Sequence, residues 1–242
     1  MTEEQILLIG TAAGIGIVHT LIGPDHYLPF ITLARARKWS LARTLGVTLA
    51  SGLGHVAGSI GLGALGLGLG WAVGGLERFE SARGATAGWL LLAFGLMYFV
   101  WGLRQALTGR PHSHLHAHAD GTLHEHQHVH RLNHAHPHES PSANRKKLLG
   151  GATAWTLFVV FVLGPCEPLI PLLMYPAASG NALGVVAVVA VFAAATLLTM
   201  VSLVLVGRAG LTLLPDGRWE RWSHAVAGAL VAVCGLAIQL GL

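Results

Sequence analysis

Uncharged, mostly hydrophobic residues form six long runs along this chain, and charged residues lie in the stretches between them. The runs cover residues 5–24, 44–76, 84–103, 148–166, 168–207 and 222–242. Each is close to or longer than the ~20 residues that a helix needs to cross a bilayer core of ~30 Å. In the fifth run, the segment PAASGN separates a short half-helix from a full helix over about 182–207. The pattern predicts an all-α integral membrane protein with six transmembrane helices.

The composition excludes a soluble domain. Of the 242 residues, 53% are hydrophobic and only 11% are charged, whereas a soluble domain carries roughly 25% charged residues. The net charge of +4 forms no patch typical of nucleic-acid binding. No nucleophile–base set or nucleotide-binding loop is visible, so we do not expect an enzyme. The N-terminus lacks the basic region and cleavage site of a removable signal peptide.

The positions of lysine and arginine predict the orientation. The stretches after the first, third and fifth helices hold thirteen of them, and the opposite side holds only Arg78 and Arg83. The thirteen are Arg35, Arg37, Lys38, Arg43, Arg104, Arg110, Arg131, Arg145, Lys146, Lys147, Arg208, Arg218 and Arg221. Since cytoplasmic loops carry the excess of positive charge, both termini are expected outside, in a bacterial inner (plasma) membrane.

A histidine-rich segment, expected in the cytoplasm, lies between the third and fourth helices. Its eleven histidines are His112, His114, His116, His118, His124, His126, His128, His130, His134, His136 and His138. Low hydrophobicity predicts a disordered loop over residues 108–147, between helical units at 1–107 and 148–242. Neutral imidazole is the commonest protein ligand for metals, so the loop is expected to bind Ni, Co, Cu or Zn. The alternative is a polar linker without metal affinity.

Two Gly-Pro segments indicate an internal repeat. The sequence GPDHYLPFI at 23–31 has a counterpart in GPCEPLIPL at 164–172. Proline lacks an N–H and clashes with the preceding helical turn, so Gly23-Pro24 and Gly164-Pro165 are expected to break their helices. The two segments are separated by three membrane crossings, which predicts two inverted three-helix repeats. Two simple proline kinks are the alternative.

Polar residues beside the first break suggest a metal site. Asp25 follows Pro24 and is expected in the first turn of a new half-helix, where a carboxylate is favoured. His19 and His26 are seven residues apart, which would place them on one face of an intact helix. Ionisable residues within a membrane are costly and are functional-site candidates by default. The alternatives are a capping role for Asp25 and a satisfied packing role for either histidine.

Further candidate ligands lie elsewhere in the apolar runs. His55 lies among glycines that permit close helix contact, and Cys166 and Glu167 take the places of Asp25 and His26 at the second break. A packing role is the alternative for His55, and a buried cysteine is often a small hydrophobic residue. This mixture of imidazole, carboxylate and thiolate suits Ni, Co, Zn or Cu better than Mg or Ca.

These residues resemble the nickel/cobalt transporter superfamily. HTLIGPDH at 19–26, followed by GLGH at 52–55, is similar to the paired motifs of nickel–cobalt permeases. In those permeases four residues separate the histidine from Asp-His, whereas five do so here. The related NicO-type exporters commonly carry a long histidine-rich loop. The resemblance implies metal-binding roles for His19, Asp25, His26 and His55. GPCEPLIPLL also resembles the broken helices of DsbD/CcdA-type thiol electron carriers, which need two pairing cysteines.

The sequence thus predicts a transporter of a divalent transition metal, with nickel or cobalt favoured. Ligands must be deprotonated to bind metal, so protons are the expected counter-ion, and the cytoplasmic loop favours export. Three alternatives remain open: a thiol-redox electron carrier, an exporter of a small anion, and a metal-binding accessory protein for metalloenzyme maturation. The sequence indicates no particular protein partner, and the lipid bilayer is the expected surroundings.

Overall fold

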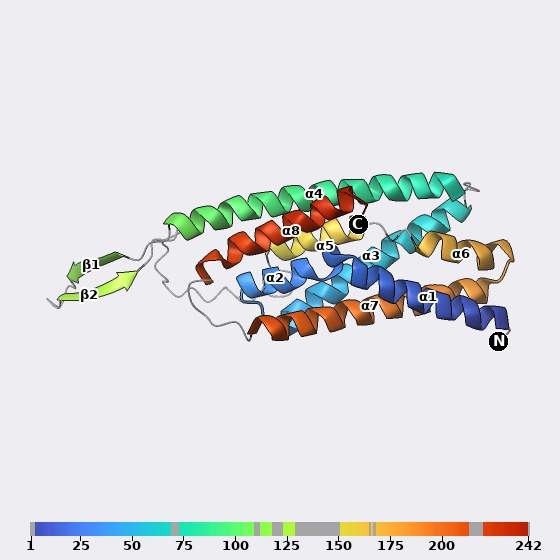
Figure 1. Ribbon diagram of the computed structural model, residues 1–242, viewed down its shortest axis with the longest axis horizontal. Coiled ribbons are helices and arrows are strands. Elements are labelled where there is room, and N and C mark those ends of the chain that lie inside the picture. The colour runs from blue at the N-terminus through green and yellow to red at the C-terminus, as the bar shows by residue number, and fades with distance from the viewer. Residues whose placement is uncertain are drawn as a thin grey trace, which may run out of the picture.

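A computed structural model describes residues 3–68, 73–108, 112–117, 123–128, 151–164, 166, 168–212 and 220–241. Its helices are α1 (Glu3–Ile22), α2 (Leu28–Ala36), α3 (Leu41–Gly68), α4 (Val73–Thr108), α5 (Ala152–Leu163), α6 (Leu169–Ala178), α7 (Ala182–Thr212) and α8 (Ser223–Gln239). Two 3-10 turns cover Pro24–His26 and Glu220–Trp222, and two strands, β1 (His112–Ala117) and β2 (Leu123–His128), complete the elements. The helices pack side by side in one elongated bundle (Figure 1).

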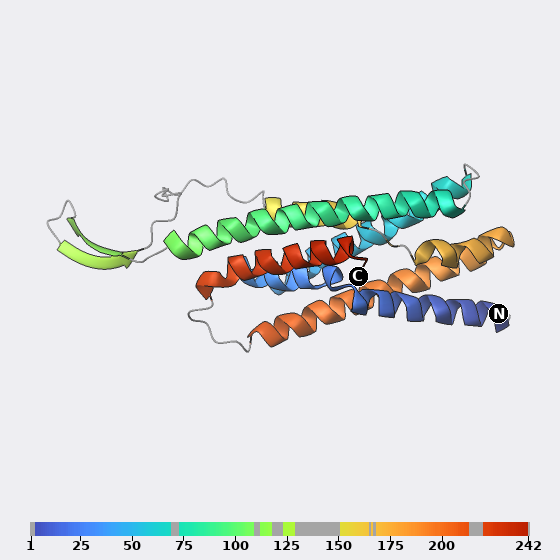
Figure 2. The same cartoon turned by 45° about the horizontal axis from the view of Figure 1, so that its top comes forward.

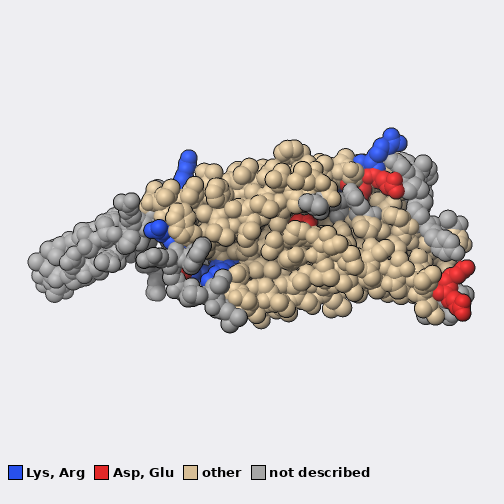
Figure 3. Space-filling view, in the orientation of Figure 1, with Lys and Arg blue, Asp and Glu red and all other residues tan. Residues whose placement is uncertain are grey.

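Five segments are long and apolar enough to cross a membrane: Glu3–Ile22, Leu41–Leu65, Gly75–Thr108, Ala182–Leu211 and Glu220–Gln239. The molecular surface agrees with a membrane-spanning bundle. Charged residues gather toward its two ends, and the surface between them is almost entirely uncharged (Figure 3). Large hydrophobic side chains such as Trp89 and Leu198 point outward from the bundle. Exposed apolar surface of this extent marks contact with lipid or another protein, so the helices suggest an integral membrane protein.

Both predicted breaks interrupt a helix. After α1 the chain makes the 3-10 turn before α2 begins, and after α5 it leaves the helix before α6 begins. The segment α1–α2 runs from the end that holds the N-terminus toward the opposite end, and α5–α6 runs the other way (Figure 1).

The first half-helix starts later than predicted. Asp25 was expected in its first turn, but Asp25 lies in the 3-10 turn and α2 begins at Leu28. Pro29 occupies the first turn of α2, and its fixed φ and missing N–H suit that position. A second proline five residues after Pro24 therefore sets the start of the half-helix.

The helices α4 and α8 pack most closely, side by side in both ribbon views (Figure 2). A Cβ added at Gly95 would collide with the backbone of Ala232, and one added at Gly228 would collide with the backbone of Phe99. Small residues let membrane helices approach to backbone contact. The helix pairs α1 with α7 and α3 with α5 form the other main contacts of the bundle.

The histidine-rich segment contains regular structure that was not predicted. Strands β1 and β2 form an antiparallel hairpin, in which His112 pairs with His128, His114 with His126, and His116 with His124. The alternation of histidine with other residues, interpreted as part of a disordered loop, also has the two-residue period of a strand. The other five loop histidines, His118, His130, His134, His136 and His138, lie outside the described residues.

The third helix starts earlier than predicted, at Val73 instead of residue 84. Arg83, which the sequence placed in an outer loop, therefore lies within the helix, with a side chain only 11% exposed. Glu80, one turn earlier, forms an ion pair with it. Paired charges are tolerated inside a membrane helix, so an arginine did not mark the helix boundary here.

Candidate metal centre

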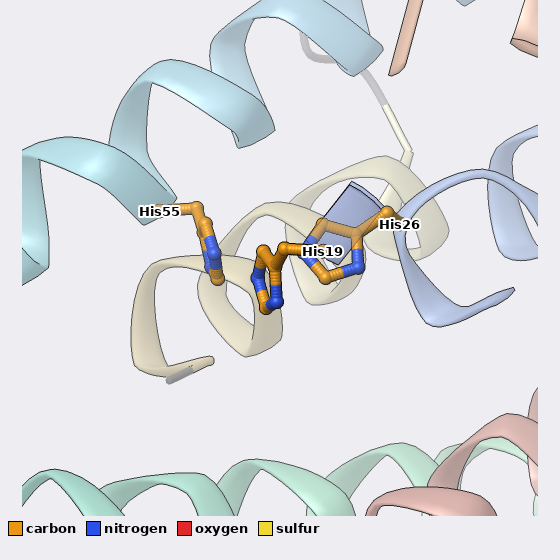
Figure 4. Close-up of side chains that lie close together, drawn as sticks. All are labelled: His19, His26 and His55. Atoms are coloured by element: carbon orange, nitrogen blue, oxygen red, sulfur yellow. The ribbon is translucent and has the colours of Figure 1, made fainter. Parts of the chain in front are cut away.

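Three histidines from separate segments meet in the middle of the bundle. His19 lies in the last turn of α1, His26 in the 3-10 turn of the first break, and His55 in the middle of α3. Their ring centroids are 4.7 Å apart for His19 and His26, 5.2 Å for His26 and His55, and 6.4 Å for His19 and His55. The rings turn toward one another (Figure 4). We call these residues the histidine triad.

Each histidine of the triad has a buried Nε2 atom without a hydrogen-bond partner in the described structure. His26 and His55 are only 3% exposed. Leaving a polar atom buried and unpaired costs about 1–3 kcal/mol, so three such atoms on neighbouring rings favour the presence of a ligand. One potential ligand atom from each residue lies within 4.8 Å of the others.

The neighbours of His26 fix its tautomer. Its Nδ1 atom lies 3.2 Å from the carbonyl oxygen of Gly23 and 3.2 Å from Oδ1 of Asp25. Both oxygens accept, so Nδ1 carries the hydrogen and Nε2 keeps its lone pair. Metal-binding histidines commonly donate their second ring N–H to a carboxylate or carbonyl in this way. Asp25 is therefore placed to orient His26, whereas the sequence pattern predicted that Asp25 binds the ion itself.

Glycine is required at the first break because the imidazole lies so close to the backbone. A Cβ added at Gly23 would lie 2.6 Å from Nδ1 of His26 and 2.9 Å from Oδ1 of Asp25. The Gly-Pro segment thus breaks the helix and leaves room for the His26–Asp25 contact.

His55 takes its orientation from the other broken segment. Its Nδ1 atom donates to the carbonyl oxygen of Phe161 at 3.2 Å, in the last turn of α5. This oxygen also accepts from the backbone N–H of Gly164 at 3.0 Å. A carbonyl oxygen has two lone pairs, so it can accept from the imidazole as well. The contact leaves Nε2 of His55 as the free nitrogen, as in His26. Both breaks therefore help to build the centre.

The triad fits a borderline transition-metal ion. Metal–imidazole bonds are about 2.0–2.1 Å long, so two nitrogens on one ion lie about 3–4 Å apart. Ligand atoms up to 4.8 Å apart would need to move closer by about 1–2 Å. Neutral imidazole suits Zn, Cu, Fe and Ni. Three protein ligands also leave coordination positions open for exchange. Phe161 packs against His26 and His55 and contributes apolar surroundings.

Of the two ligands predicted at the second break, the structure describes Cys166 alone. Cys166 is fully buried in an apolar cluster with Ala12, Leu169 and Phe192 and is not among the grouped ligand atoms. Pro165 and Glu167 lie outside the described residues. Cys166 and Cys234 are both free thiols.

Two features of this region were missed from the sequence. The first is the ion pair of Glu80 and Arg83, which reaches the second break. The second is a line of buried polar side chains on one face of α3, comprising Thr44, Thr48, Ser51, His55 and Ser59. Their spacing of three or four residues is that of one helix face. The periodicity was visible in the sequence and would have placed His55 on an inward face.

Comparisons with known proteins give no further identification. No protein-family model, no curated protein and no solved structure matches this chain.

Proposed function

We propose that this chain is a membrane transporter of a divalent transition-metal ion, with nickel or cobalt as the favoured ions. The ion binds to the Nε2 atoms of His19, His26 and His55, and Asp25 orients His26. The observation that carries this proposal is a group of three histidines in the middle of an apolar bundle. One ring nitrogen of each lies within 4.8 Å of the others, and each Nε2 atom is buried without a described hydrogen-bond partner. The resemblance of HTLIGPDH and GLGH to the nickel/cobalt transporter superfamily favours those two ions.

The arrangement of the helices supports a transporter built from two inverted repeats. In this proposal α1–α2, α3 and α4 correspond to α5–α6, α7 and α8, with α5 and α6 together as the sixth crossing. If each helix is exchanged for its counterpart in the other repeat, the contact of α1 with α7 becomes the contact of α5 with α3. Both are main contacts of the bundle. The broken segments run in opposite directions (Figure 1). Irregular backbone at membrane depth commonly surrounds a transported ion.

Proton coupling follows from the chemistry of the ligands. An imidazole must lose its proton before Nε2 can bind a metal ion, so metal and protons compete for the same nitrogens. In the proposed cycle, metal leaves toward the outside as protons reach the triad. The histidine-rich segment lies in the cytoplasm in this scheme and collects ions on the side they leave from.

Flux through reconstituted protein tests the proposal. Two chains are placed in proteoliposomes: the wild type and a variant with its eleven loop histidines replaced by glutamine. An indicator reports the flux of Ni²⁺, Co²⁺, Zn²⁺ or Cu²⁺, with and without a pH gradient. Gradient-dependent flux of Ni²⁺ or Co²⁺ that persists without the loop histidines and is lost in His26→Ala supports transport through the triad. Flux that His26→Ala leaves unchanged contradicts it.

Two alternative functions predict different results in the same preparation. A metal-binding accessory protein binds Co²⁺ at the triad but carries no flux. A thiol-redox carrier needs Cys166, forms a mixed disulfide through it with a partner, and loses activity in Cys166→Ser. Both described cysteines are free thiols, whereas the triad is complete without either one, and this contrast favours metal chemistry.

A further inference from the structure

A buried ion pair joins α4 to the second helix break. Glu80 and Arg83 lie one turn apart near the start of α4, and their side chains are 1% and 11% exposed. The Nη2 atom of Arg83 lies 2.7 Å from Oε1 of Glu80. Ionisable residues inside a membrane helix are rare and usually functional, and the triad uses neither of them.

The pair binds backbone groups that the break leaves without helix partners. Arg83 Nη2 donates to the carbonyl oxygen of Gly164 at 2.9 Å. The backbone N–H of Cys166 donates to Oε1 of Glu80 at 2.9 Å. Backbone groups in an apolar interior need such partners, so these contacts hold the chain in place on both sides of the break.

Ser59 connects the pair to the helix that carries His55. Its hydroxyl donates to Oε1 of Glu80 at 2.7 Å and accepts from Nη2 of Arg83 at 2.6 Å. Ser59 lies one helical turn after His55 on α3. We call Ser59, Glu80 and Arg83 the clamp.

The segment that the clamp holds is the segment that orients His55. The clamp binds Gly164 and Cys166, and the carbonyl oxygen of Phe161, one turn earlier, accepts from Nδ1 of His55. The two regions touch, because a Cβ added at Gly164 would lie 3.2 Å from Nδ1 of His55. A shift of this segment would therefore move the acceptor that fixes the imidazole.

At the first break, the backbone hydrogen bonds are formed within the break itself. The carbonyl oxygen of Gly23 accepts from the backbone N–H of His26 at 3.1 Å and from its Nδ1 at 3.2 Å. Residues of the first break thus form the hydrogen bonds of its own backbone, and one of them, His26, is also a candidate metal ligand. The second break supplies an acceptor for His55 and is held from α3 and α4.

We propose that the clamp is the positioning device of the metal centre. By holding Gly164 and Cys166, it keeps the carbonyl of Phe161 where it directs Nε2 of His55 toward His19 and His26. Glu80, Arg83 and Ser59 are positioning residues and do not touch the ion. The inference rests on the proposed binding of metal by the triad.

A matched pair of serines on α3 provides the mildest test. Ser51 and Ser59 each lie four residues from His55, and both are buried, but only Ser59 contacts the ion pair. Both substitutions, Ser59→Ala and Ser51→Ala, are made in the full chain with the loop histidines replaced by glutamine. Titration with Co²⁺ then reports its Kd and the shape of its visible d–d absorption band. Ser59→Ala is expected to weaken Co²⁺ binding severalfold and to change the band, and Ser51→Ala is expected to leave both at the parent's values.

A stronger test removes both charges at once. Removing one partner of a buried ion pair leaves an uncompensated charge, so Glu80→Gln is combined with Arg83→Gln. Since loss of an outer partner typically costs a metal site about 10- to 100-fold in affinity, the double variant is expected to bind Co²⁺ at least about tenfold more weakly. Glu77→Gln, an exposed position on the same helix, is the control.

The readouts separate positioning from a purely structural role. A clamp that only stabilises the fold would lower the yield and the melting temperature, but the folded fraction would keep the parent's Kd and absorption band. That result in the double variant and in Ser59→Ala would overturn the inference. If the double variant does not fold, Ser59→Ala decides alone.

One further variant separates this inference from the proposed function. If His55→Ala leaves Co²⁺ binding unchanged in the same background, the triad is not the metal site and both proposals fail. If His55→Ala abolishes binding while the clamp variants behave like the parent, only the positioning role is wrong.

Discussion

The Nδ1 atom of His55 lies 3.2 Å from the carbonyl oxygen of Phe161, although 106 residues separate the two along the chain. This contact joins α3 to the end of α5 and leaves Nε2 of His55 for the triad. It ties the geometry of the candidate metal centre to the second helix break, which contributes no described ligand of its own.

This contact predicts the protonation state of the ring. Phe161 offers a carbonyl oxygen, which only accepts, so neutral His55 must carry its hydrogen on Nδ1. Nitrogen-15 NMR of the metal-free protein labelled at histidine, with His55→Gln to assign the signal, should show a protonated Nδ1 and an unprotonated Nε2. A protonated Nε2 would mean that His55 does not present a lone pair to the triad.

Removal of a triad histidine should abolish high-affinity metal binding. Outer partners of metal ligands are worth about 10- to 100-fold in affinity, and a ligand is worth more, so His19→Ala should weaken Co²⁺ binding by more than about 100-fold. Isothermal titration with the loop histidines replaced by glutamine measures this loss. His224→Ala is the control, because His224 contacts Tyr98 at 2.8 Å and lies outside the triad; an equal loss there would argue against a specific site.

Asp25→Asn should weaken metal binding without abolishing it. The carboxylate lies 3.2 Å from Nδ1 of His26, and the amide keeps its shape but loses the charge that makes His26 a better ligand. The expected loss in Co²⁺ affinity is about 10- to 100-fold. A larger loss, equal to that of His26→Ala, would instead identify Asp25 as a direct ligand, the role that the sequence pattern predicts.

Metal binding should weaken as the pH falls. An imidazole in water has a pKa of about 6.5, and protonation of a triad nitrogen removes its lone pair. The Kd for Co²⁺ in the loop-substituted chain should therefore rise between pH 7.5 and pH 5.5. Flux into proteoliposomes should likewise fall when the side that binds metal is made acidic. A Kd that does not change over this range would contradict the proposed exchange of metal with protons.

Packing of α4 against α8 should depend on its glycines. A Cβ at Gly95 would meet the backbone of Ala232, which cannot move aside, whereas a Cβ at Gly10 on α1 would meet nothing within 4 Å. Overpacking costs about 1–3 kcal/mol, so Gly95→Ala should lower the melting temperature of the detergent-solubilised protein. Gly10→Ala should leave it unchanged or raise it slightly. Equal melting temperatures for the two variants would show that α4 and α8 do not pack this closely.

Local residue pattern was sufficient to predict much of this protein. Five of the predicted hydrophobic runs coincide with helices that are long and apolar enough to cross a membrane. Transfer of apolar side chains out of water is favourable, so a long apolar run favours burial in lipid or protein. Both Gly-Pro breaks were predicted correctly, since proline lacks an N–H and clashes with the preceding turn, and glycine accepts the bend. The sequence pattern predicted His19, His26 and His55 as separate site candidates, because an imidazole within an apolar run is costly unless it has a role, and the structure groups the three.

Other features depended on partners distant in the sequence, and only the tertiary structure shows them. Arg83 was assigned to a loop because nothing near it in the sequence shows that the second break accepts its hydrogen bond. Asp25 was taken as a ligand, whereas its contact with Nδ1 of His26 depends on the exact turn that Pro29 and Gly23 impose. The distance between His55 and the other two histidines is set by the packing of α3 between α5 and α7. A chain's local pattern indicates which runs form apolar helices and where Gly-Pro breaks them, but the contacts between helices decide which polar atoms meet.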